Sequence, residues 1–165
     1  MLLLSRTVVG DLSEDGVDEV SRFVNRANSP DHTPYGEVFS GERLEPGGLL
    51  EEFSASHLIC LRREAELVGT VVLTPGEGEL WVNLLSVAPE ERGQGLGEQL
   101  LSEAEAFARE HGASYLTLEA VHVGKLITYY LGIGFTELER NLIPAGVWDS
   151  HRPFELVKLQ RPVLP

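Results

Sequence analysis

A glycine-rich stretch is the part of this 165-residue sequence whose residue types and spacing point most directly to chemistry. Gly93, Gly95 and Gly97 follow the apolar residues 84–88 and lead into a helical pattern of apolar side chains. Glycine lets the main chain approach a bulky group closely, and the free N–H groups at a helix start carry partial positive charge. The spacing therefore predicts an anion site, typical of phosphate binding, between a buried strand and a helix.

Two common nucleotide motifs do not fit this stretch. A P-loop requires a Lys-Ser or Lys-Thr pair after its last glycine, whereas Gly97 is followed by Glu-Gln. The Rossmann pattern G-x-G-x-x-G is matched at Gly93 and Gly95, and Glu119 resembles its ribose-binding acid, but the third glycine position holds Glu98. The preceding strand also emerges from a run of hairpins instead of opening a strand–helix–strand unit. The P-loop is therefore excluded, and the Rossmann motif is disfavoured.

A different pair of motifs does fit. The pattern Arg92-x-x-Gly95-x-Gly97, after the residues Leu-Ser-Val-Ala-Pro, resembles the acetyl-CoA signature of the GNAT superfamily of N-acetyltransferases. Residues 130–135, Tyr-Leu-Gly-Ile-Gly-Phe, resemble the Tyr-x-x-x-Gly-Phe motif of the same family. The order of the expected elements over residues 2–160 agrees with that family as well. The resemblance implies an α/β fold with a mixed, mostly antiparallel central sheet flanked by helices.

The resemblance also implies a reaction. An acetyl group would pass from acetyl-CoA to a primary amine by direct attack in a ternary complex, with a small-molecule amine favoured as acceptor. Backbone N–H groups of the glycine loop would hold the CoA pyrophosphate, and the pantetheine arm would pair with the exposed edge of the preceding strand. Arg92 would contact a phosphate or only cap the loop. The implied CoA contacts are Leu85, Ser86, Val87, Arg92, Gly93, Gln94, Gly95, Leu96 and Gly97.

This reaction requires a base for the amine and an acid for the departing thiolate. The family commonly uses the tyrosine that matches Tyr130 as general acid; the alternative is a ring that only packs under the cofactor. Tyr129 points elsewhere on a helix and is expected in the core. Many family members carry a glutamate that acts as base where this chain has Asn83. The base is therefore sought at Glu119 or His122, at the end of the next strand, with Glu79 or a water chain as further alternatives. Each of these two is alternatively a surface or hydrogen-bonding residue.

The acceptor side of the site is less defined. A second departure from the family lies at Val123, where an asparagine often touches the cofactor. Two polar loops, residues 28–35 and 143–153, are expected to face the acceptor, and their aromatic and charged side chains suggest an aromatic wall with some negative charge. These side chains are His32, Tyr35, Trp148, Asp149 and His151.

Three hypotheses about function remain open. An acetyltransferase acting on a small amine leads, and a non-catalytic acyl-CoA-binding or regulatory module is motivated by Asn83. The third keeps the enzyme but changes the acyl group or the acceptor, for example to a protein N-terminus or an aminoglycoside.

Hydrophobic periodicity predicts the elements that must position these residues. Strands are expected over residues 2–9, 57–63, 67–73, 79–87, 114–121, 135–142 and 154–160. Helices are expected from Glu14, capped by Ser13, and over residues 37–43, 49–54, 96–111 and 125–131. The almost wholly apolar run 79–87 is expected to be a central strand covered on both faces.

Length and composition bound the remaining interpretation. The chain is expected to form a single GNAT-type domain over residues 1–165, with 42% hydrophobic residues. A formal net charge of −13 disfavours a nucleic-acid partner and fits either a cationic substrate or simple solubility. The single cysteine, Cys60, excludes an intrachain disulfide and a thiolate metal cluster, and no metal is expected. With neither a signal peptide nor a membrane span, a cytoplasmic protein is expected, and family habit suggests a homodimer.

Overall fold

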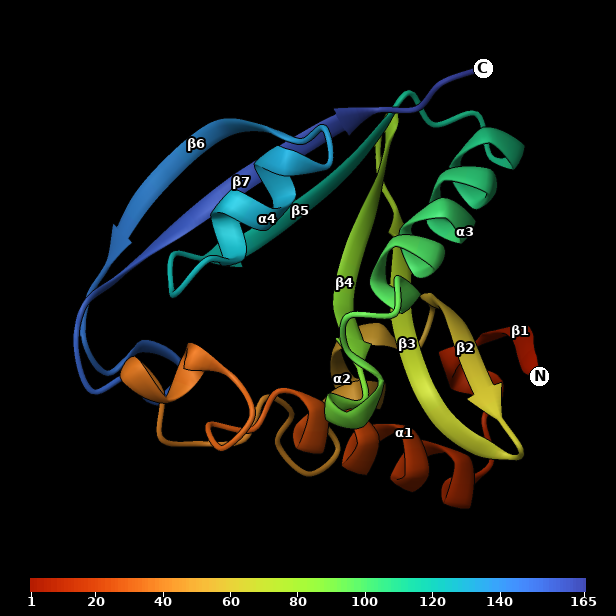
Figure 1. The fold of residues 1–165 in the computed structure, drawn as a ribbon, viewed down its shortest axis with the longest axis horizontal. Helices are drawn as coiled ribbons and strands as arrows, with labels where there is room; N and C mark the ends of the chain where they lie inside the picture. Colours follow the sequence, from red (N-terminus) through yellow and green to blue (C-terminus); the bar gives the residue numbers. More distant parts are fainter.

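The computed structural model describes residues 1–165 and contains one seven-stranded sheet with the order β1-β2-β3-β4-β5-β7-β6 (Figure 1). The strands are β1 (Leu2–Val8), β2 (His57–Arg63), β3 (Glu66–Pro75), β4 (Glu79–Val87), β5 (Tyr115–Val121), β6 (Thr136–Ile143) and β7 (Phe154–Pro162). The helices are α1 (Glu14–Ala27), α2 (Gly48–Phe53), α3 (Leu96–Glu110) and α4 (Leu126–Gly132). Every pair of neighbouring strands is antiparallel except β4 and β5, so the expected mixed, mostly antiparallel α/β fold is confirmed. None of the helices is long and apolar enough to cross a membrane.

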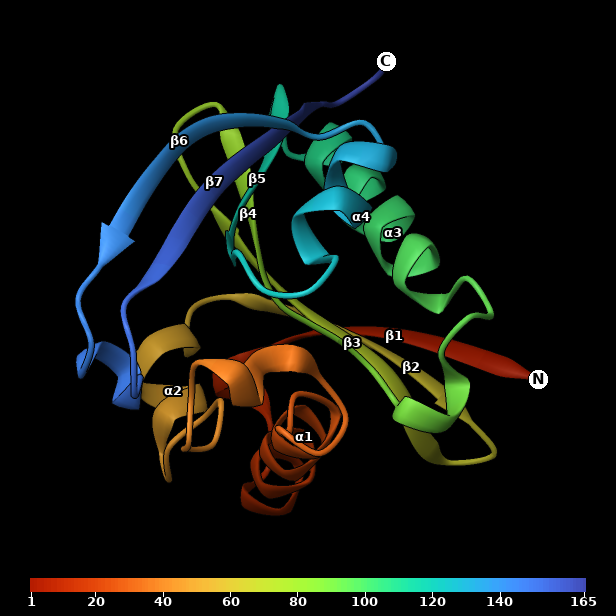
Figure 2. The same cartoon turned by 60° about the vertical axis from the view of Figure 1, so that its left-hand side comes forward.

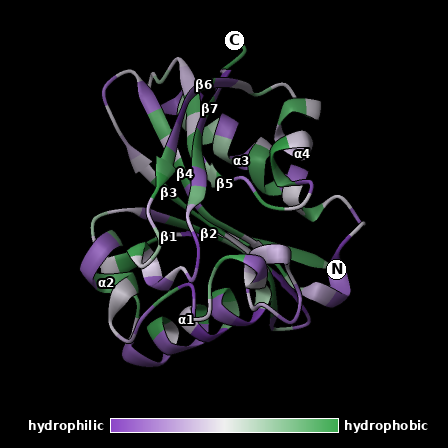
Figure 3. Cartoon of the chain, turned by 90° about the vertical axis from the view of Figure 1, so that its left-hand side faces the viewer, coloured by the Kyte–Doolittle hydropathy of each residue, from purple (hydrophilic) through white to green (hydrophobic).

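Helices cover both faces of the sheet, with α1 and α2 on one side and α3 and α4 on the other (Figures 1 and 2). The larger core cluster lies under α3 and α4 and includes Leu100 and Phe107. The second cluster lies under α1 and includes Val24 and Cys60. In Figure 3 the central strands are mostly hydrophobic, whereas α1 alternates between hydrophilic and hydrophobic residues.

The start of α1 follows the sequence signals closely. The backbone N–H of Gly16 donates to Ser13 Oγ at 3.0 Å, which satisfies one of the free donors of the first turn. Glu14 and Asp15 add negative charge where the helix dipole favours it. The expected N-cap of this helix is therefore confirmed.

The sheet divides between β4 and β5. These strands pair in parallel only where Glu79–Trp81 meets Tyr115–Thr117, and β4 and β5 do not pair with each other beyond these residues. In Figure 1, β5, β7 and β6 fan away from β4 beyond this short contact. From Val82 to Val87, β4 therefore pairs with β3 on one side only, and its other edge faces the gap.

A β-bulge at Leu84 changes which face of the sheet the following side chains of β4 occupy. The pairing with β3 shifts register at this point, and Leu84 has a φ of 51°. Before the bulge, Leu80 and Val82 pack in the α3 cluster, whereas Leu84 packs in the α1 cluster and Leu85 returns to the α3 side. The expectation that residues 79–87 are covered on both faces is wrong in part, since buried and half-buried residues alternate along the strand.

The expected helix over residues 37–43 is also wrong. A short 3-10 turn over Pro34–Glu37 takes its place, because Pro34 fixes the first φ of that turn. Beyond it, Phe39 forms an isolated antiparallel bridge with Ser150. That bridge is a tertiary contact, so the local pattern of residues could not reveal it.

Candidate active site

The glycine loop between β4 and α3 forms an open cradle of backbone donors. Gly93 and Gly95 have φ values of 79° and 80°, and no atom lies within 4 Å of the position that a Cβ would take at either residue. The N–H groups of residues 93–98 donate no hydrogen bond within the protein, and the first donor of α3 is Gln99 N, to Gly95 O at 3.0 Å. Free donors at the N-terminus of a 15-residue helix favour an anion.

The free edge of β4 leads directly to this cradle. Leu85, Ser86 and Val87 lie beyond the last residue of β4 that pairs with β5, so their outer edge is available to an extended chain. The Ser86 side chain is already engaged on the other side of the strand, where its Oγ accepts from Asn28 Nδ2 at 2.9 Å. Any contact of Ser86 with a ligand in the gap would therefore be made by its main chain.

Tyr130 lies on α4 with only 8% of its surface exposed. Its ring packs edge-on against Phe135, with ring centres 5.5 Å apart, and its hydroxyl makes no hydrogen bond to the protein. Burial raises the pKa of Tyr130 above its usual value of 10.0, and nearby Tyr35 and Tyr129 act in the same direction. The phenol therefore keeps its proton and remains a hydrogen-bond donor throughout the neutral range.

Tyr129 is not a core residue, contrary to the expectation. It is 39% exposed, and its hydroxyl lies 3.4 Å from the position that a Cβ would take on Gly97. This hydroxyl is therefore a further polar group beside the glycine cradle. The local sequence carries no signal for this contact, because it depends on how α4 packs beside α3.

Glu119 lies on β5 at the point where the sheet opens. It follows Thr117, the last residue of β5 that pairs with β4, by two positions, just as Asn83 follows Trp81 on β4. Because side chains two residues apart in a strand share a face, Glu119 and Asn83 flank the gap on the same face of the sheet. Glu119 is exposed and has no hydrogen-bond partner in the protein, whereas Asn83 Nδ2 donates to Thr74 Oγ1 at 3.1 Å.

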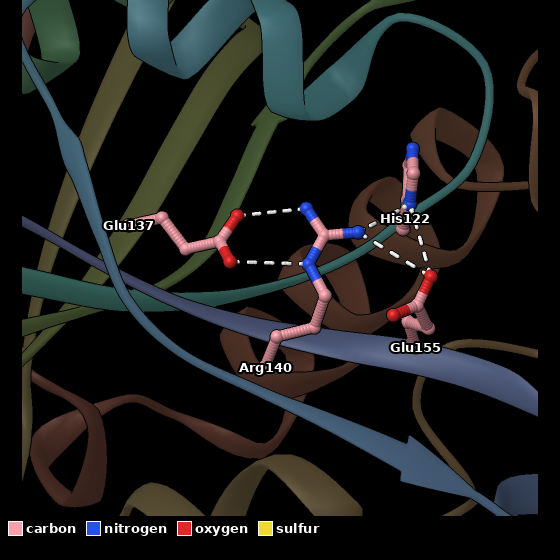
Figure 4. A network of polar contacts seen from close by, with 4 residues as sticks. All are labelled: His122, Glu137, Arg140 and Glu155. Atoms are coloured by element: carbon pink, nitrogen blue, oxygen red, sulfur yellow. Dashed lines mark hydrogen bonds and ion pairs between the residues drawn. The ribbon is translucent and has the colours of Figure 1, made fainter.

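His122 belongs to a surface network that also includes Glu137, Arg140 and Glu155 (Figure 4). Arg140 Nη1 lies 2.8 Å from His122 Nδ1, and Arg140 Nη2 donates to Glu137 at 2.7 Å. A guanidinium group can only donate, so His122 Nδ1 accepts and the ring nitrogen's lone pair is engaged. Among the two candidate bases, Glu119 alone presents a free proton acceptor.

The second loop expected to face the acceptor, residues 143–153, contacts residues 36 and 38, which directly follow the first loop. His151 N donates to Val38 O at 2.8 Å, and His151 Nε2 donates to Gly36 O at 3.1 Å. Trp148, which is 62% exposed, lies over Phe154 with ring centres 5.8 Å apart. Trp148 is therefore an exposed aromatic side chain on the second loop, and the expected aromatic wall stays a prediction.

Arg92 and Val123 both contact the first of these loops. Arg92 Nη2 donates to Ala27 O and Arg92 Nη1 to His32 O, each at 2.5 Å. Val123, the position where the family often has asparagine, is buried in a small cluster with Val38, and Tyr35 of the loop packs against the same cluster. Val123 thus supports the loop through packing.

These features define the class of protein. A mixed sheet that opens between two parallel strands, with a glycine-rich loop leading from one of them into a helix, is the acyl-CoA N-acyltransferase fold. Residues 23–135 match the model of the Acetyltransferase (GNAT) family, and the chain belongs to that family.

Individual relatives agree with this assignment. The chain is 31% identical over 112 residues to a streptothricin acetyltransferase of Streptomyces lavendulae, an alignment that covers 64% of this chain and 59% of that protein. Its fold is similar to that of the ribosomal-protein-S18-alanine N-acetyltransferase of Escherichia coli, with a TM-score of 0.74, 16% identity, and coverage of 100% of this chain and 96% of that one. A GNAT acetyltransferase of Elizabethkingia anophelis with acetyl-CoA bound has a TM-score of 0.67 at 14% identity, covering 98% and 97% of the two chains.

Proposed function

We propose that the protein transfers an acetyl group from acetyl-CoA to a primary amine of a small molecule, by direct attack in a ternary complex. The observation that carries this proposal is the continuity of the free β4 edge with the glycine cradle. An extended pantetheine arm fits the first and a pyrophosphate fits the second. The similarity to a streptothricin acetyltransferase supports a small-molecule acceptor.

The main chain supplies most of the proposed donor contacts. Residues 85–87 would hydrogen-bond to the pantetheine arm, and residues 93–97 would hold the pyrophosphate through their N–H groups. A free N–H group on β4 would also polarise the thioester carbonyl and stabilise the oxyanion that forms there. The Tyr129 hydroxyl adds a side-chain donor next to Gly97.

Two side chains handle the protons. An alkylamine is mostly protonated near neutral pH, so Glu119 takes one proton from it, directly or through water. The neutral nitrogen attacks the carbonyl carbon of the thioester, the new C–N bond forms and the C–S bond breaks. The thiolate that leaves takes the phenolic proton of Tyr130, and the nitrogen releases its remaining extra proton to solvent. Tyr130 and Glu119 belong to opposite faces of the sheet, which allows acid and base to act from different sides.

A screen of primary amines with acetyl-CoA, followed by release of free thiol, tests this function. With an accepted amine, we expect Tyr130→Phe to lower kcat by about 100-fold, the typical contribution of a positioned general acid. Its Kd for CoA is expected to stay within about threefold of the wild-type value, less than 1 kcal/mol of binding energy.

Two other outcomes would redirect the proposal. Tight CoA binding without turnover of any amine would favour a non-catalytic acyl-CoA-binding module. If the protein did not bind CoA at all, the proposed function would be wrong.

A further inference from the structure

The guanidinium group of Arg92 is fully engaged with main-chain carbonyls on the acceptor side. Ala27 O is the last carbonyl of α1, and His32 O belongs to the loop that follows this helix. A cation at a helix C-terminus interacts favourably with the helix dipole. Arg92 donates from two separate nitrogen atoms, whereas a lysine has one nitrogen to serve both carbonyls.

Two further contacts join the same segment to the end of β4. Asn28 Nδ2 donates both to Ser86 Oγ at 2.9 Å and to Val24 O at 2.8 Å. Arg26 forms a double hydrogen bond with Glu90, at 2.6 and 3.2 Å, on the short turn just before the glycine loop. The end of α1 and the loop after it are therefore joined to the segment between Ser86 and Arg92 at three points. The Arg92 contact reaches furthest along the loop after α1, to His32.

Residues 28–37, here called the acceptor loop, in turn contact α4 and the segment before it. Pro34 lies only 2.9 Å from the position that a Cβ would take on Gly124, whose φ is 51°. Tyr35 packs against the small cluster that contains Val123, just before α4. The acceptor loop thus spans from Arg92, at the start of the glycine loop, to the segment that leads into the helix carrying the proposed acid.

We infer that Arg92 is a positioning residue for the acceptor site and is not a phosphate ligand. Its side chain holds the acceptor loop against the start of the glycine loop. The inference rests on the proposed function, since it assigns the acceptor side of that same site. A phosphate would have to displace two carbonyl contacts before it could bind this guanidinium. The cradle itself is supplied by main-chain donors.

The variants Arg92→Ala and Arg92→Lys test this assignment, with Arg63→Ala as matched control. Arg63 pairs with Glu91 on the same turn, at 3.0 Å, but makes no hydrogen bond to the acceptor loop. The measurements are amide hydrogen exchange of residues 28–37 without any ligand, the Kd for CoA by calorimetry, and acceptor KM with an amine found in the screen.

Both Arg92 variants are expected to exchange faster over residues 28–37, while Arg63→Ala exchanges like the wild type. Acceptor KM should rise about tenfold in both, with a smaller change in kcat, and the Kd for CoA should stay within about threefold. The lysine variant keeps the charge but loses the double contact, so it should resemble the alanine variant.

A phosphate role predicts the opposite pattern and would overturn the inference. In that case Arg92→Ala would weaken CoA binding by about tenfold or more, Arg92→Lys would restore most of it, and exchange over residues 28–37 would not change. If wild-type protein failed to bind CoA, the proposed function would fall. The exchange measurement would still show whether Arg92 holds the acceptor loop.

Discussion

At the scale of single residues, Glu119 lies across the gap from Asn83, the position where many family members carry a glutamate. The two positions are equivalent across the gap, each two residues beyond the Trp81–Thr117 pair. Sequence alone placed Glu119 and His122 on an equal footing, because both end the same strand. Their partners distinguish them: the His122 lone pair is used by Arg140, whereas Glu119 is free.

We therefore expect unequal effects from two matched substitutions. Glu119→Gln should lower kcat/KM by about 100-fold at pH 8, because it removes the proton acceptor but keeps the size of the side chain. His122→Gln should change kcat/KM by less than about threefold, since it removes only an exposed contact to Arg140. Initial rates with a saturating donor measure both. A larger loss for His122→Gln would move the base to that residue.

The burial of Tyr130 also predicts a pH dependence. A general acid must hold its proton, and the raised pKa of Tyr130 moves the loss of that proton to pH values above 10.0, its ordinary value. Loss of activity from Tyr130 ionisation should therefore not begin between pH 8 and about pH 10. A pH–kcat profile of the wild type checks this. A decline over that range in the wild type that Tyr130→Phe lacks would contradict it.

At the scale of elements, glycine spacing predicted the cradle, but not what surrounds it. Gly93 and Gly95 need no neighbours to adopt a positive φ, so their pattern could be recognised locally. The approach of Tyr129 to Gly97 depends on packing between α3 and α4, and the bulge at Leu84 depends on pairing with β3. Neither depends on neighbouring residues alone.

Gly97 offers a test in which stability and binding change in opposite directions. Gly97→Ala adds a methyl group at ordinary contact distance from Tyr129 and replaces glycine in the first turn of α3. The free energy of unfolding should rise by up to about 1 kcal/mol. CoA affinity should fall about tenfold or more, because the methyl group occupies space next to the cradle.

Gly132→Ala is the control for this test, since Gly132 is an exposed helical residue with no atom near its Cβ position. It should stabilise the protein similarly without weakening CoA binding. Thermal unfolding and calorimetry measure the two quantities. Unchanged CoA affinity in Gly97→Ala would show that the phosphate does not approach this residue.

At the scale of the whole molecule, the order of strands and helices followed from hydrophobic periodicity, because each element buries one side against a core. The opening of the sheet did not follow from composition or periodicity, since the parallel contact of Glu79–Trp81 with Tyr115–Thr117 joins segments separated by α3. Likewise, the prediction of a helix over residues 37–43 was wrong. The bridge from Phe39 to Ser150 joins distant parts of the chain, so local periodicity could not reveal it. The family resemblance, and not the local pattern, predicted that residues 85–87 lie at an exposed strand edge.

The burial of Cys60 in the core under α1 should make the free energy of unfolding depend on pH. Burial raises the pKa of this thiol from 9.0 to about 11. Above pH 9 the unfolded chain loses the thiol proton while the folded protein keeps it, so stability falls as pH rises towards 11. A shift of this size corresponds to at most about 3 kcal/mol.

Denaturant unfolding at pH 8 and pH 11 should show a smaller loss of stability in Cys60→Ala than in the wild type, even though the variant starts less stable through lost packing. Equal losses in both proteins would mean that the thiol ionises as readily in the folded core as in water.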